Sequence, residues 1–130
     1  MSIKNSKAWL EVIRIVASVE VELSKVLQAQ HGLGLSEYRA LEILAQTESA
    51  ELRMQELATQ LGLNQSSVSR MVERLERAGH TIRDLCPDDK RGVYAVLTDK
   101  GRAQFEQARQ DYEQALDSAL KQHGGERLLR

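Results

Sequence analysis

Apolar residues recur every three or four positions over most of the chain, which is the spacing of amphipathic α-helices. Ser36 and Asn64 are suited to cap two of these helices, Thr98-Asp99 to begin the last, and Gly62 and Gly79 to end two of them. Five helices are therefore predicted, over residues 8–29, 36–47, 54–61, 64–78 and 98–123.

The first helix is apolar on more than one side. Its main set of apolar residues at helical spacing is Leu10, Ile13, Val16, Ala17, Val21, Val26 and Leu27. Its other sides carry Trp9, Val12, Ile15, Val19 and Leu23. A surface helix of a monomer rarely has this pattern, so a second partner surface is expected.

Two β-prone runs, 81–85 and 92–97, flank the turn-forming segment 86–91. They predict a hairpin with Lys90 and Arg91 near its tip. A single proline and few aromatic residues argue against an all-β sandwich. The expected fold is therefore mostly α, of the α+β kind.

The composition fits one compact domain of 130 residues with a formal net charge of −1. No run is apolar enough to span a membrane and no signal peptide is evident, so a cytoplasmic protein is expected. The single cysteine, Cys86, agrees with a reducing compartment. Motifs for phosphate loops, nucleophile elbows or zinc proteases are missing, so neither an enzyme nor a cofactor is expected.

The third and fourth helices form a helix-turn-helix candidate. If Val68, Met71, Val72 and Leu75 are buried, the opposite side of the fourth helix presents Ser66, Arg70, Glu73 and Arg77, with Ser67, Ser69 and Arg74 beside them. Hydroxyls and free amides at a helix amino end suit phosphate, and arginine can read guanine. An ordinary solvated helix face is the simpler alternative, and the basic hairpin that follows favours DNA binding.

The chain resembles the MarR (multiple antibiotic resistance regulator) family of winged helix-turn-helix proteins. The residues that carry this resemblance are Leu57-Ala58, Leu61-Gly62, Ser66 to Val72, Leu75-Glu76, Gly79, Asp89-Lys90-Arg91 and Leu97 to Arg102. The aspartate-x-arginine pair followed by Leu-Thr-x-x-Gly is the most specific part.

The resemblance implies a homodimeric repressor that binds a pseudo-palindromic operator and is released by a small-molecule effector. Residues 1–31 and 102–130 would form dimerisation helices, and 35–101 the DNA-binding lobe. In such proteins the wing arginine, here Arg91, enters the minor groove and is held by Asp89, while Lys90 would contact phosphate. The full expected DNA-binding set is Asn64, Gln65, Ser66, Ser67, Ser69, Arg70, Arg74, Asp89, Lys90 and Arg91.

Two features depart from the family pattern. His80-Thr81 stands where an apolar residue and then a basic one are expected at the start of the wing, and Gly124-Gly125 interrupts the last helix where the family usually continues into another dimerisation helix. The dimer geometry is therefore open.

Three further sites have competing interpretations. Arg14 needs a partner, either a carboxylate such as Glu11 or one from a second subunit, or an anionic aromatic effector with Trp9 and Tyr38 as pocket walls. The three histidines and Cys86 lack zinc-pair spacing, so no metal site is expected. Cys86 is interpreted as an unreactive turn residue, with a redox switch as the alternative.

The rival to a DNA-binding regulator is a winged-helix module that binds another protein without nucleic acid. The two hypotheses differ in ionic-strength dependence, because phosphate contacts weaken steeply with added salt.

Overall fold

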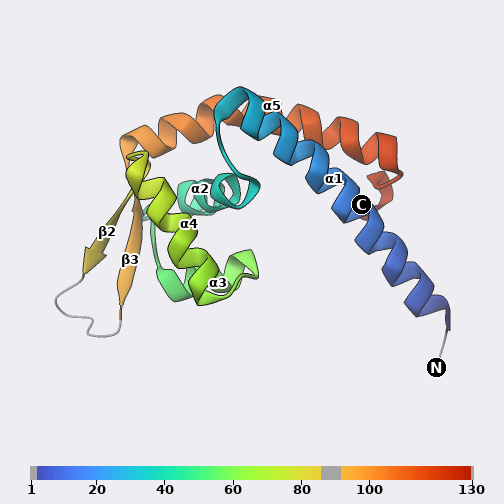
Figure 1. Ribbon diagram of the computed structural model, residues 1–130, viewed down its shortest axis with the longest axis horizontal. Helices are drawn as coiled ribbons and strands as arrows, with labels where there is room; N and C mark the ends of the chain where they lie inside the picture. The colour runs from blue at the N-terminus through green and yellow to red at the C-terminus, as the bar shows by residue number, and fades with distance from the viewer. Residues whose placement is uncertain (1–2, 86–91, 130) are drawn as a thin grey trace. The chain divides into compact units, whose positions relative to one another are not determined.

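The computed structural model describes residues 3–85 and 92–129. The elements, in chain order (Figure 1), are α1 Ile3–His31, α2 Leu35–Gln46, β1 Glu51–Arg53, α3 Met54–Leu61, α4 Gln65–Arg77, β2 Thr81–Leu85, β3 Val93–Leu97, α5 Asp99–His123 and the 3-10 helix η1 Glu126–Leu129. The described residues contain the five predicted helices and both strands of the hairpin, which confirms a mostly helical winged fold.

One strand, β1, was not predicted. The sheet has the order β1-β3-β2 and is antiparallel, with Glu51 opposite Val96 and Arg53 opposite Tyr94. No element was predicted between the helices expected over 36–47 and 54–61, and the structure has a strand there. Three residues are too few to show the alternation of a strand, so only pairing with β3 makes the segment recognisable.

Some helix ends also differ from the prediction. Helix α1 is longer than predicted at both ends, and α2 ends at Gln46 rather than Thr47. Helix α2 begins at Leu35, so Ser36 lies within its first turn instead of capping it. The described helices include none with the length and apolar content needed to cross a lipid bilayer.

The chain divides into two compact units, one of residues 1–35 and 108–130 and one of residues 36–107. We call them the helical unit and the winged unit. In the winged unit, Tyr38 of α2 is fully buried and packs against Phe105 of α5, with ring centroids 5.6 Å apart. Other buried residues of this core are Leu41, Leu44, Leu57, Val68, Met71, Val72, Leu75, Ala95 and Leu97.

In the helical unit, the stripe that α1 buries shares only Leu27 with the main predicted set. The buried residues are Ile15, Val19, Leu23 and Leu27. Of the main set, Leu10, Ile13, Val16 and Val21 are exposed. Because nearly every side of α1 is apolar, sequence periodicity could not single out the side that the chain itself covers.

The segment after α5 folds back toward α1. Gly124 has a φ of 74°, and a Cβ on Gly125 would lie 2.8 Å from Ile15 Cγ2. Arg127 of η1 contacts the Glu11 carboxylate of α1. The predicted interruption at Gly124-Gly125 is thus confirmed, and it redirects the chain onto the first helix.

Candidate nucleic-acid interface

The amino end of α4 is fixed by its cap. Gly62, with a φ of 68°, ends α3 in the left-handed region, and two residues later Asn64 is extended. The Oδ1 of Asn64 accepts a hydrogen bond from the Ser67 amide at 2.9 Å. This satisfies one of the amides that a helix leaves open at its amino end, and the predicted cap is confirmed.

The two sides of α4 are divided as predicted. Val68, Met71, Val72 and Leu75 are buried, and Ser66, Arg70, Glu73 and Arg77 are exposed. From Gln65 to Val72 the helix carries no acidic residue. Hydroxyls, unpaired amides and the positive end of the helix dipole are therefore presented together at the exposed amino end, where an anion is favoured.

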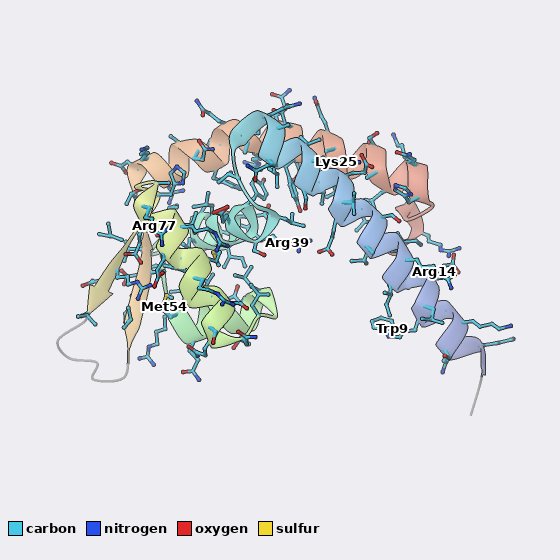
Figure 2. All side chains as sticks on the ribbon, viewed as in Figure 1. Trp9, Arg14, Lys25, Arg39, Met54 and Arg77 are labelled. Carbon is cyan, nitrogen blue, oxygen red and sulfur yellow. The ribbon has the colours of Figure 1, made fainter. Side chains whose placement is uncertain are left out.

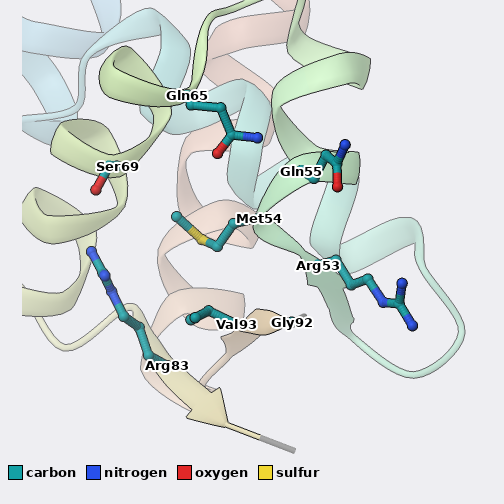
Figure 3. A pocket seen from close by; sticks show the side chains of 8 residues that line it. All are labelled: Arg53, Met54, Gln55, Gln65, Ser69, Arg83, Gly92 and Val93. Carbon is teal, nitrogen blue, oxygen red and sulfur yellow. The ribbon is translucent and has the colours of Figure 1, made fainter. Parts of the chain in front are cut away.

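Two hollows of the winged unit flank this end of α4. One, of about 330 Å³, lies between α3, α4 and the sheet (Figure 3) and is lined by Arg53, Met54, Gln55, Gln65, Ser69, Arg83, Gly92 and Val93. The other, of about 270 Å³, lies toward α2 and includes Ser36, Ser67, Arg70 and Arg74. Arg74 is also 3.7 Å from the Glu37 carboxylate of α2. Five predicted contact residues therefore line these hollows, Gln65 and Ser69 the first and Ser67, Arg70 and Arg74 the second, and Asn64 caps the helix that carries them.

The motif Leu97-Thr98-x-x-Gly101 joins the end of α4 to the start of α5. The Thr98 hydroxyl donates to the Gly79 carbonyl at 2.6 Å and accepts from the Gly101 amide at 3.0 Å. The Thr98 amide donates to the His80 carbonyl at 3.1 Å. These bonds attach the end of β3 and the start of α5 to the backbone between α4 and β2. They therefore fix β2 and β3, which form the root of the wing, relative to α4.

The two residues that depart from the family pattern, His80 and Thr81, are both buried. His80 is 8% exposed and Thr81 is 1% exposed. Within the described part of the chain, neither His80 Nδ1 nor Thr81 Oγ1 has a hydrogen-bond partner. Burial lowers the pKa of His80, the charge of Lys100 lowers it further, and Glu37 opposes them. Burial and Lys100 thus favour the neutral form of His80 at this junction.

Sequence reasoning missed Arg83, on β2. Its Nε donates to Glu76 of α4, and its Nη2 is 3.9 Å from Glu73. A basic residue within a short β-prone run gives no signal of its own; the pairing of β2 with β3 directs it at α4. The wing residues Asp89, Lys90 and Arg91, together with Cys86, lie outside the described residues.

The predicted effector residues fall in different places. Tyr38 is fully buried in the core of the winged unit, so it does not form an exposed pocket wall. Trp9 is 63% exposed, and both it and Arg14 project from α1 of the helical unit (Figure 2). Of the three partners considered for Arg14, Glu11 contacts Arg127 instead, and Arg14 is solvent-exposed, so a carboxylate of a second subunit and an effector stay as predictions.

No group of three His, Cys, Asp or Glu side chains in residues 3–85 and 92–129 is arranged to hold a metal ion. His31 instead lies 2.7 Å from the Asp111 carboxylate, linking α1 to α5. Its role within the described structure is therefore a contact between helices.

The capped helix α4, the preceding short helix α3 and the following β2–β3 hairpin define a winged helix-turn-helix protein. A model of the MarR family matches residues 33–93. The crystal structure of Sco3205, a MarR family transcriptional regulator from Streptomyces coelicolor in complex with DNA, is 31% identical with a TM-score of 0.84, over 94% of this chain and 77% of that one. The chain belongs to the MarR family of transcriptional regulators.

Two other relatives are similar over different extents. The uncharacterized HTH-type transcriptional regulator YkoM of Bacillus subtilis is 39% identical over 72 residues, or 55% of this chain and 46% of that protein. The chain thus spans less than half of that relative's length. The crystal structure of NadR in complex with 4-hydroxyphenylacetate is 25% identical with a TM-score of 0.72, over 92% of this chain and 83% of that one.

Proposed function

We propose that this chain is a sequence-specific regulator that binds duplex DNA through α4 and the wing, and represses transcription. The observation that carries the proposal is the exposed amino-terminal half of α4, which is free of acidic residues and bears Ser66 and Arg70 beside a capped helix end. Phosphates bind to such helix ends, and arginine reads guanine in the major groove. Sco3205, similar over most of the chain, was crystallised with DNA.

The DNA-bound form we propose is a homodimer. Helix α1 exposes large apolar side chains, among them Trp9 at 63%, Leu10 at 48% and Ile13 at 44%. Covering such a surface with a second copy removes it from water. Residues 1–31 and 102–130 would supply the dimer contacts and residues 35–101 would bind DNA. Two α4 helices about one helical turn of DNA apart would then require an inverted repeat.

Release by a small anionic or aromatic effector is the regulatory part of the proposal. NadR, with the same fold, was crystallised with 4-hydroxyphenylacetate, an aromatic carboxylate. On this chain, Trp9 offers an exposed aromatic face and Arg14 an exposed cation on the same helix. Such a ligand acts only by favouring a dimer whose α4 helices no longer match both half-sites.

The test of DNA binding is selection of bound duplexes from a random pool at physiological salt. The proposal expects an enriched inverted repeat, with affinity that falls steeply as salt is added. Failure to enrich any sequence, with no salt-dependent binding, would support the protein-interaction module instead.

Two substitutions separate base reading from phosphate contact. Arg70→Ala is expected to cost about 1–3 kcal/mol on the enriched duplex and to relax specificity at one position, as loss of a base contact does. Arg91→Ala tests the minor-groove contact that the family resemblance implies, and Lys90→Ala should lower affinity about equally on all sequences. Lys100→Ala, at the exposed start of α5 and outside both the expected DNA-binding set and the proposed dimer segments, is the matched control.

A further inference from the structure

The contact between α4 and the wing is polar where the two elements face each other. In the β2–β3 pairing, Arg83 lies opposite Ala95, which is fully buried. Residues opposite each other in an antiparallel sheet share a face. The Arg83 side chain therefore leaves β2 on the core side of the sheet and extends toward α4 (Figure 3).

Charged groups alternate from α4 across to β2. Arg77 Nη2 lies 3.8 Å from Glu73, and Glu73 lies 3.9 Å from Arg83 Nη2. Arg83 Nε donates to Glu76 as well. The two carboxylates of α4 are thus each paired with a cation, and Arg83 is shared between them. Its side chain is 35% exposed and that of Glu76 is 31% exposed, so this contact is partly shielded from water.

The hollow of about 330 Å³ increases the importance of this contact. Arg83 of β2 and Ser69 of α4 both line it, together with the apolar side chains of Met54 and Val93, so the space between α4 and the outer part of the sheet is not completely filled. An angle between two elements that packing leaves loose must be set by the directional contacts that span the gap. Arg83 is a side chain that does so.

We propose that Arg83 is a positioning residue, which holds the wing at a fixed angle to α4 through Glu76 and Glu73 and raises DNA affinity without contacting phosphate itself. This inference rests on the proposed DNA-binding function. Its electrostatic consequence is that Arg83 and Arg77 together offset the negative charges of Glu73 and Glu76 on a helix directed at DNA.

The first test needs no DNA. Amide hydrogen exchange of β2 and β3 is measured in the full chain for Arg83→Gln, Glu76→Gln and the double variant. Each single change is expected to speed exchange about three- to fivefold, as loss of a partly exposed ion pair does, and the double variant to add little more. Unchanged exchange, or fully additive effects, would overturn the proposed coupling.

The second test measures affinity for the duplex most enriched by the wild-type chain, over a series of salt concentrations. Both single variants are expected to bind about three- to fivefold more weakly, with the wild-type salt dependence. A direct phosphate contact predicts otherwise: Arg83→Gln would lower the slope by about one, and Glu76→Gln would tighten binding by removing a negative charge. Either result would overturn the proposal.

A charge exchange and a control complete the design. Glu76→Arg combined with Arg83→Glu should recover part of the affinity, because the pair between positions 76 and 83 is re-formed in reverse while Glu73 loses its contact with Arg83. Arg102→Gln removes an exposed cation from α5 of the same unit and should leave wing exchange unchanged. If the wild-type chain binds no duplex, the proposed function fails, and the exchange measurements alone decide whether Arg83 orders the wing.

Discussion

A Cβ atom on Gly101 would lie 2.1 Å from the carbonyl oxygen of His80. The first turn of α5 therefore packs directly against the backbone that leads from α4 into β2. The same backbone carbonyl accepts from the Thr98 amide, so it cannot move away without losing a hydrogen bond. The family's Leu-Thr-x-x-Gly motif is thus explained here by a backbone contact that only glycine permits.

Replacing this glycine should destabilise the winged unit. Gly101→Ala is expected to lower the free energy of unfolding by about 1–3 kcal/mol, because the added methyl group meets backbone rather than a flexible side chain. Urea unfolding followed by circular dichroism measures the change, and Arg102→Ala at the next, exposed position is the control. Equal stability of the two variants would contradict the close approach.

The capping role of Asn64 can be tested separately from the effect of a charge at the same position. Asn64→Ala removes the acceptor of the Ser67 amide and should cost about 1 kcal/mol of folding stability. Asn64→Asp keeps a capping oxygen, so stability should be retained. Its negative charge at the proposed phosphate-binding end should nevertheless weaken DNA binding, as measured by fluorescence anisotropy. If Asn64→Asp instead kept both stability and DNA affinity, while Asn64→Ala lost both, the result would argue against a phosphate contact at this helix end.

Burial of His80 predicts acid sensitivity. Folding lowers the pKa of His80, so the unfolded chain binds the proton more tightly and acid favours unfolding. The stabilisation is fully present above about pH 6.5, the ordinary pKa of histidine, and is lost as pH falls through the lowered value.

The measurement is the urea midpoint from about pH 8 to about pH 5. His80→Gln should flatten the decline below about pH 6.5, and Lys100→Gln, which removes the neighbouring positive charge, should lessen it. Glu37→Gln should steepen it, since that carboxylate favours the protonated ring. An unchanged profile in His80→Gln would assign the acid sensitivity to other groups.

Two isoleucines of α1 distinguish folding from assembly. Ile15 is 6% exposed and Ile13 is 44% exposed. Ile15→Asp places a charge in the core of the helical unit and should cost about 3 kcal/mol or more. Ile13→Asp should change folding little but weaken the proposed homodimer by about tenfold or more, as measured by sedimentation. A monomeric wild-type chain would remove the basis for this assignment.

Local patterns predicted much of the winged unit. The spacing of Val68, Met71, Val72 and Leu75 identified the buried side of α4, and a carboxamide before the helix identified its cap. Both features depend only on residues within a few positions of each other, so the sequence alone is enough to predict them. The effector residues were less predictable, because burial of Tyr38 depends on Phe105, far along the chain.

What the sequence by itself determined was therefore the type and order of the main elements, because helical periodicity and capping are local properties. The tertiary structure decided which of the apolar sides of α1 the chain buries, that residues 51–53 pair with β3, and that Arg83 faces the carboxylates of α4. Each of these depends on contacts between segments distant in sequence, whose energies no local pattern encodes.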